Sequence, residues 1–187
     1  NFVDVNGKGR AVLYDFSTGR GGENARRVLQ GFAGTLVTDD FSGYHALQSQ
    51  GVTAALCMAH ARRKLFEAHQ FNGSEIAGHA VALIARLYEI ERDFKDRPRD
   101  ERLVARQQRA APIIAAFKAW LDKTYGKLPP RSVLAKAMLY TLNRWKALNA
   151  YLRDGMLGID NNPVENAIRG IALGRKNWLF AGSEGGG

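Results

Sequence analysis

The sequence is poor in cysteine, and it contains no long apolar run and no internal repeat. Its single cysteine, Cys57, excludes an internal disulfide and fits a reducing compartment. No segment approaches the ~20 apolar residues that a membrane-spanning helix needs, and the first residues do not resemble a signal peptide. These absences exclude two classes, the disulfide-stabilised secreted mini-protein and the membrane protein.

The composition is that of a folded protein. Of the 187 residues, 45% are hydrophobic and 10% aromatic, which is enough for a sizeable core and argues against general disorder. A chain of this length forms one domain by default, in some cases with an inserted subdomain. The sequence begins on Asn1 rather than on Met, so we expect a fragment of a longer protein.

Positive charge is concentrated after the first 56 residues. Residues 1–56 hold five basic and five acidic residues, whereas residues 57–187 hold 22 basic and 13 acidic ones and so carry the whole net charge of +9. Such an excess attracts phosphate backbones through counterion release and indicates a polyanionic partner. An arginine-rich helical surface without a ligand explains the same composition, so charge alone leaves both interpretations open.

Strands alternate with short helices in the first 60 residues, which predicts an α/β sheet. The evidence is a set of short apolar runs bounded by glycine or aspartate, with helical spacing between them. In chain order we expect a hairpin (2–5 and 11–14, with its turn at 6–9), a helix (23–32), a strand (34–39), a helix (44–50) and a strand (52–57).

From about residue 61 the apolar spacing becomes helical. Apolar residues recur every three or four positions in four successive segments, which predicts four helices between residues 61 and 157. Pro112 should kink or split the third helix, and the fourth follows a proline pair and should end near Gly155. A last helix is predicted with Asn162 as its N-cap and Pro163 at its first position.

Asp39 stands where the strand over 34–39 ends, next to Asp40. A side chain at the carboxyl end of such a strand faces the crevice where α/β sheets bind ligands. Carboxylate oxygens are the ligands that Mg²⁺ prefers, and two-metal phosphoryl transfer brings several of them to one point. Asp39 is the better candidate because it still belongs to the strand. The alternative, that Asp39 or Asp40 caps the next turn or helix, stays open.

Glu165 also has two interpretations. It follows Asn162 by three residues and so completes a capping box, and Arg169 one turn later offers an ion pair. In the functional interpretation, Glu165 ligates a metal from the first turn of a helix packed against the sheet. The two roles do not exclude each other.

Cys57 and His60 form half of a metal-binding pattern. One cysteine and one histidine do not fill a tetrahedral zinc shell, and the sequence contains no second pair of this kind. A structural zinc is therefore not expected, and a buried cysteine with a hydrogen-bonded histidine is the favoured interpretation.

Basic residues follow the Cys57–His60 pair and also the helix that begins after Asn162. Such residues suit phosphate contact, and a neighbouring aromatic ring suits base stacking. Trp178, beside the second group, is interpreted as a core residue. The candidate DNA contacts are Arg62, Arg63, Lys64, Arg169, Arg175 and Lys176.

Three sequence blocks together resemble the IS66-type insertion-sequence transposases. They occur in the order expected for that family, with a helical segment between the last two, and the similarity extends over nearly the whole chain. The blocks are Leu36-Val37-Thr38-Asp39 with Gly43-Tyr44, residues 57–64 (CMAHARRK), and residues 159–166 (IDNNPVEN) with residues 174–183 (GRKNWLFAGS).

The resemblance implies a DDE enzyme whose α/β, RNase H-like core is interrupted by a large all-α insertion. Three carboxylates of such enzymes hold two Mg²⁺ ions, for which Mn²⁺ can substitute. The metals activate water to nick DNA and then activate the freed 3′-OH to attack target DNA. By motif, Asp39 would be the second carboxylate and Glu165 the third, and Cys57 and His60 match a motif thought to shape the site.

The first carboxylate of that triad has no match in this sequence. Asp4 and Asp15 lie on the two arms of the predicted hairpin and do not fit the motif. We therefore expect the first Asp, the first strand and the family's DNA-binding region upstream of Asn1, and the glycine-rich end indicates truncation there too. A chain with two of three carboxylates is expected to be inactive on its own.

The resemblance also implies an organisation and a set of partners. We expect an incomplete first part of the core (1–60), a helical insertion subdomain (61–158) and a last core helix that carries the glutamate (159–187). The implied partners are DNA at element ends and target, further copies of the protein on DNA, and accessory proteins of the same element, with no membrane. The implied location is the bacterial cytoplasm, at the nucleoid.

Two other functions stay open. In a non-catalytic DNA-binding or assembly module, the acidic residues would be caps and the basic helices would bind DNA. A different RNase H-like nuclease or resolvase would share the metal site but would hydrolyse DNA without joining strands.

Overall fold

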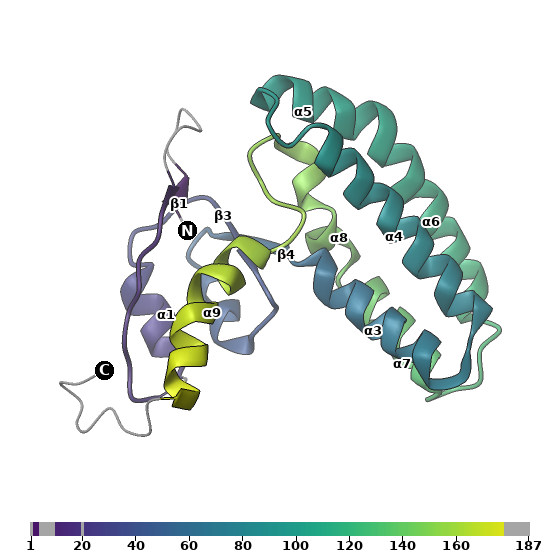
Figure 1. Cartoon of the computed structure of the whole chain (residues 1–187), viewed down its shortest axis with the longest axis horizontal. Helices are drawn as coiled ribbons and strands as arrows, with labels where there is room; N and C mark the ends of the chain where they lie inside the picture. Colours follow the sequence, from purple (N-terminus) through teal and green to yellow (C-terminus); the bar gives the residue numbers. More distant parts are fainter. Residues whose placement is uncertain (1, 4–9, 20, 178–187) are drawn as a thin grey trace. The chain divides into compact units, whose positions relative to one another are not determined.

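The computed structural model describes residues 2–3, 10–19 and 21–177, and these fall into two compact units (Figure 1). What we call the mixed unit comprises the described parts of residues 1–36, 40–53 and 161–187. The helical unit comprises residues 37–39 and 54–160. No helix among the described residues is long and apolar enough to cross a membrane.

The strands form two short pairs. β1 (Phe2–Val3) and β2 (Arg10–Ala11) pair antiparallel, which confirms the predicted hairpin with a second arm that starts earlier than expected. The predicted turn at 6–9 and Asp4 lie outside the described residues. β3 (Thr35–Thr38) and β4 (Thr53–Leu56) form the second pair and confirm both predicted strands to within one residue at each end.

β3 and β4 run parallel. The Thr53 N–H donates to the Gly34 carbonyl at 2.8 Å, and the Cys57 N–H donates to the Thr38 carbonyl at 3.0 Å. Both bonds join residues at the same sequence offset, which only a parallel register gives. The predicted α/β class is thus present as a small parallel pair within a mostly helical chain, while the RNase H-like arrangement of a larger sheet stays a prediction.

The helices of the mixed unit are short, except the last. They are α1 (Gly22–Val28), the 3₁₀ turn η1 (Ser42–Tyr44), α2 (His45–Gln48) and α9 (Asn162–Asn177). α9 starts one residue before the predicted position, since the Val164 and Glu165 N–H groups both donate to the Asn161 carbonyl. The Tyr14 hydroxyl donates to the Ala167 carbonyl at 2.8 Å and so ties the segment after β2 to α9.

Four long helices make up most of the helical unit: α3 (Met58–Asn72), α4 (Glu75–Asp93), α6 (Ala111–Tyr125) and α7 (Val133–Asn143), with the shorter α5 (Arg99–Ala105) after α4 (Figure 1). Their facing sides bury one apolar core, in which Leu65, Ile84 and Phe117 are fully shielded from solvent. α3 ends at Gly73, whose φ of 65° is a left-handed conformation that glycine adopts without steric cost.

The third predicted helix is not split at Pro112. It continues through this proline, with a widened turn just before it. A π-helical turn, η2 (Arg106–Ala110), joins α5 to α6, and Pro112 lies in the first turn of α6. A proline lacks an N–H and crowds the turn before it, so a widened turn at this point relieves both problems without ending the helix.

The fourth predicted helix is wrong as a single element, because the chain breaks twice within it. α7 is followed by α8 (Trp145–Leu148) and the 3₁₀ turn η3 (Ala150–Arg153). The breaks fall at Arg144 and Asn149, whose φ values are −107° and −102°. The Asn149 side chain donates to the Trp145 carbonyl at 2.7 Å, the kind of local side-chain bond that competes with helix continuation.

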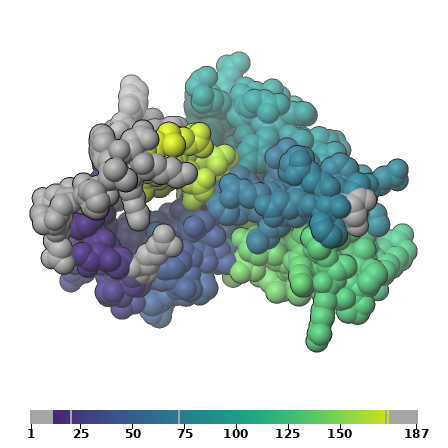
Figure 2. Space-filling model, turned by 60° about the horizontal axis from the view of Figure 1, so that its bottom comes forward, coloured from purple at the N-terminus to yellow at the C-terminus, as the bar shows by residue number. Residues whose placement is uncertain are grey.

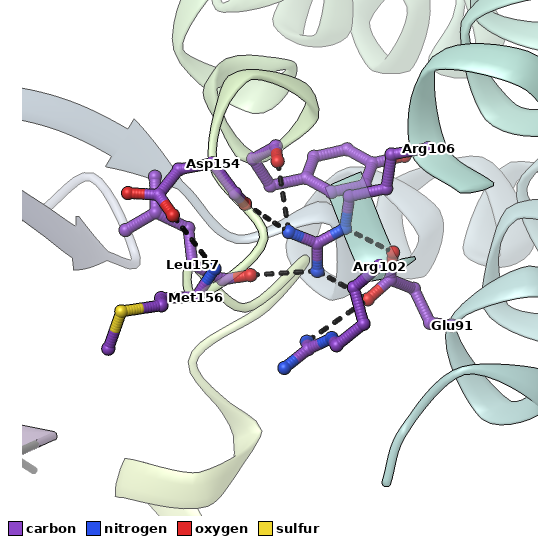
Figure 3. Close-up of polar contacts among 7 residues, drawn as sticks. Glu91, Arg102, Arg106, Asp154, Met156 and Leu157 are labelled. Atoms are coloured by element: carbon purple, nitrogen blue, oxygen red, sulfur yellow. Dashed lines mark hydrogen bonds and ion pairs between the residues drawn. The ribbon is translucent and has the colours of Figure 1, made fainter. Parts of the chain in front are cut away.

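A buried arginine in η2 fixes the segment that follows these breaks (Figure 3). Arg106 is 1% exposed and its guanidinium forms a two-bond pair with Glu91 of α4, at 2.8 and 2.6 Å. The remaining N–H groups donate to the carbonyls of Tyr151, Asp154 and Leu157. All five donors of the guanidinium are thereby used, so its charge is compensated although it is removed from water.

Replacing Arg106 by Met should destabilise the protein by about 3–5 kcal/mol, because Glu91 and three carbonyls would lose their buried partner. The matched control is Arg109→Met in the same turn, whose pair with Asp93 has both side chains about half exposed, and which should cost less than about 1 kcal/mol. Urea unfolding followed by circular dichroism measures both. Equal losses would contradict a central role for Arg106.

Candidate active site

Two aspartates, Asp39 and Asp160, lie where β3 and β4 end and α3 begins. The first two backbone N–H groups after β4 are bonded to other segments: that of Cys57 donates to Thr38 and that of Met58 donates to Ile159, each at 3.0 Å. Asp39 directly follows Thr38, and Asp160 directly follows Ile159. All of these residues belong to the helical unit. This is the carboxyl end of a parallel strand pair, the edge at which α/β sheets bind ligands.

Asp39 is exposed, while Thr38 before it is buried at the end of β3. The turn η1 that follows has Phe41 as its N-cap residue, and the Phe41 side chain makes no capping bond. The neighbouring Asp40 has a φ of 72°, and its Oδ1 lies 3.3 Å from Nε2 of His45. The two adjacent aspartates therefore differ in their surroundings, and only Asp40 has this contact with His45.

Asp160 was missed by sequence reasoning, and the structure gives it a defined partner. It is half-buried and accepts a hydrogen bond from the Tyr88 hydroxyl of α4 at 2.9 Å. Burial raises the pKa of Tyr88 far above its usual range, and the negative charge of Asp160 and its hydrogen bond act in the same direction. Tyr88 thus remains a proton donor to Asp160 at all ordinary pH values.

Cys57 and His60 lie at the N-terminus of α3. Cys57 is 1% exposed and is the N-cap residue, and its carbonyl accepts the His60 N–H at 3.2 Å. The sulfur and the nearby Arg62 both act on the pKa of Tyr88, the first raising it and the second lowering it. The pKa of Tyr88 therefore depends on Cys57 and Arg62 as well as on Asp160. The site-shaping role of Cys57 and His60 stays a prediction.

Glu165 lies in the first turn of α9, in the mixed unit, and is half-buried. Arg169, one turn later on the same helix, is exposed. Asp39 and Glu165 belong to different units, and the expected convergence of their carboxylates stays a prediction.

The predicted DNA contacts differ in their surroundings. Arg62 is half-buried, with its guanidinium carbon 5.8 Å from the centre of the Phe66 ring, whereas Arg63 is exposed. Lys64 is exposed, and its Nζ lies 4.8 Å from the centre of the Tyr140 ring. Arg175 and Lys176 are part of α9, but their side chains, like all of Trp178, lie outside the described residues.

The described residues do not by themselves form a site for the expected metal pair. Nowhere in the described part of the chain do three or more side chains of histidine, cysteine, aspartate or glutamate gather closely enough to hold an ion. A pair of Mg²⁺ ions needs several converging carboxylates, which Asp39 and Asp160 do not supply on their own.

Comparison with known proteins identifies the family. Residues 2–187 match the family described as "Transposase IS66 family", and the chain belongs to that family. It is similar to two uncharacterized proteins of Sinorhizobium fredii (strain NBRC 101917 / NGR234), y4jD and y4hP. The identity to y4jD is 39%, over 95% of this chain and 36% of that relative. The identity to y4hP is 35%, over 94% of this chain and 35% of that relative. The chain thus spans about a third of the length of these relatives. No solved structure matches it.

Tyr88 and Tyr151 should make stability fall above pH 10. Burial raises the pKa of both Tyr88 and Tyr151 above the ordinary value of about 10, and Glu91 acts in the same direction on Tyr151. Above pH 10 the unfolded chain loses these protons while the folded chain keeps them, so the free energy of unfolding drops by about 1.4 kcal/mol per pH unit for each tyrosine.

Urea titrations between pH 9 and pH 11 measure this slope. Tyr88→Phe should remove the contribution of Tyr88 to this slope. The matched control is Tyr125→Phe, which removes the hydroxyl of another half-buried tyrosine of the helical unit. An unchanged slope in Tyr88→Phe would contradict the desolvation of the Tyr88 hydroxyl at its hydrogen bond with Asp160.

Proposed function

We propose that this chain is a catalytic part of a transposase that cuts DNA at the ends of its element and joins the freed strands to target DNA. Membership of the IS66 transposase family supports a function in transposition. The observation that carries the catalytic assignment is the position of Asp39, an exposed residue directly after the buried end of a strand in a parallel pair.

Asp39 and Glu165 are proposed as the second and third carboxylates of a DDE site. We infer a dependence on divalent metal, with two Mg²⁺ ions replaceable by Mn²⁺, and we assign no step to these ions because the described residues do not complete a site for them. The first carboxylate is proposed to lie in another part of the whole protein. Cys57 and His60, at the start of α3, are proposed to hold the shape of this edge of the sheet.

The proposed organisation follows from these roles. Residues 1–60 and 159–187 would contribute to an RNase H-like core, and residues 61–158 would be a helical insertion. DNA would be the partner, bound by the Arg62–Lys64 segment together with Arg169, Arg175 and Lys176. Self-association on DNA, accessory proteins of the element and a place at the bacterial nucleoid are parts of the same proposal.

A second candidate is a DNA-binding or assembly module without catalysis. The basic surface favours it, because 22 basic residues against 13 acidic ones after residue 56 suit a polyanion whether or not chemistry follows. The two functions differ in whether the carboxylate of Asp39 is needed.

Asp39→Asn in a full-length transposase that carries this chain should abolish strand cleavage, by at least about 100-fold, and leave DNA affinity unchanged. The substitution removes the charge and keeps the shape. Asp40→Asn is the matched control, because it makes the same change one residue away and asparagine tolerates the left-handed backbone found there.

Cleavage of a labelled element end and electrophoretic mobility shift measure the two properties. The non-catalytic module predicts that neither variant alters either property, and cleavage by Asp39→Asn at the normal rate would rule out the catalytic assignment.

A further inference from the structure

One segment of the helical unit carries basic residues and no acidic ones. Between Asp122 and Asp154 the sequence contains seven lysines and arginines and not a single aspartate or glutamate. This segment includes α7 and α8, and it accounts for most of the net charge of the chain. The cations listed in chain order are Lys123, Lys127, Arg131, Lys136, Arg144, Lys146 and Arg153.

Part of this charge forms a row along α7. Lys136, Tyr140 and Arg144 are spaced four residues apart, so they lie on one side of the helix and its C-terminal end. Lys136 is exposed, and Tyr140 and Arg144 are half-buried. The row therefore borders solvent over two helical turns.

Lys64 of α3 completes the row from the neighbouring helix. α3 and α7 pack against each other, and in Figure 2 the green surface formed after residue 125 adjoins the blue surface of α3. The Lys64 Nζ lies 4.8 Å from the centre of the Tyr140 ring, and the guanidinium carbon of Arg144 lies 4.0 Å from the same centre. One aromatic ring thus holds two cations from different helices.

This arrangement positions positive charge rather than neutralising it. Cation–π contacts orient a lysine or arginine over the ring but leave its net charge in place. Two cations at one ring raise the local positive potential, which a bound anion lowers. Phosphate oxygens are suitable anions, because arginine and lysine both bind them by charge-assisted hydrogen bonds.

We propose that the surface formed by Lys64, Lys136, Tyr140 and Arg144, the α3–α7 row, binds the phosphate backbone of double-stranded DNA. The proposal rests on the proposed function, which makes DNA the polyanion that this protein meets. The Tyr140 ring already carries two cations, so it orients phosphate contacts and does not stack on bases. Binding by the α3–α7 row is therefore independent of base sequence and does not prefer single strands.

The test measures the affinity of the 187-residue chain for a fluorescent duplex by anisotropy, at several salt concentrations. In the triple variant Lys64→Gln, Lys136→Gln, Arg144→Gln, affinity should fall at least about 10-fold and the slope of log K against log salt should become shallower by about 2 to 3. The double variant Lys64→Gln, Lys136→Gln changes only exposed side chains and should lose about two thirds of that slope, which keeps the test valid if Arg144 affects folding.

The matched control removes three exposed cations elsewhere in the same unit, by Arg92→Gln, Lys95→Gln and Arg97→Gln. These lie at the end of α4 and in the loop before α5, next to Asp93 and Asp96, and they change the net charge by the same amount. The control should retain most of the affinity. Tyr140→Leu should weaken binding several-fold while Tyr140→Phe, which keeps the ring, should not.

Three results would overturn the proposal: no measurable affinity of the unmodified chain for duplex DNA, equal losses in the row and control variants, or a change in self-association of the row variant with unchanged DNA binding. The last would assign the row to an interface between copies. The test of the α3–α7 row can fail while the catalytic assignment of Asp39 holds, and the reverse is also possible. In full-length transposase the row variant should bind duplex DNA more weakly, whereas Asp39→Asn should bind it with unchanged affinity and not cut it.

Discussion

The helical unit depends on the compensated charge of Arg106. This guanidinium lies at the π-helical turn between α5 and α6, pairs with Glu91 of α4 and binds three carbonyls of the returning chain. A segment with two helix breaks and a 3₁₀ turn has few backbone bonds of its own, so these carbonyls need an external donor. The segment leads to Ile159, which bonds to the start of α3, and so to Asp160. Packing inside the helical unit thereby fixes one carboxylate at the edge where β3 and β4 end.

The helical unit combines two kinds of chemistry. Near the start of α3, Asp160 accepts a hydrogen bond from Tyr88, and Asp39 follows the neighbouring strand β3. Along α3 and α7, cations are held over an aromatic ring and border solvent. The proposed function needs both, because the protein would hold DNA backbone by charge and act on a phosphodiester with carboxylates. α3 begins two residues after β4, the partner of the strand that precedes Asp39, so the proposed DNA binding along α3 and α7 would act close to the proposed catalytic residue.

Patterns within short sequence segments predicted the strands. They did not predict contacts between segments that are far apart in the sequence. β3 and β4 were predictable because each is an apolar run between turn residues, and α9 was predictable from Asn162-Pro163. Arg106 was not, because an arginine within a charged stretch usually lies in solvent, and its burial depends on Glu91 and on carbonyls about 50 positions later. The Tyr88–Asp160 bond joins residues 72 positions apart, and no local pattern encodes it. The breaks at Arg144 and Asn149 were missed because apolar spacing continues through them.

The claim that this chain serves strand transfer is tested most directly by following the fate of the cut DNA. Full-length transposase would be incubated with a labelled element end, a supercoiled target and Mg²⁺, and the products would be sequenced across their junctions. The account predicts that the 3′ ends of the element become covalently joined to target DNA and that chelation of the metal prevents this. Cut ends that are never joined would identify a nuclease instead, and bound but uncut DNA would identify a binding module.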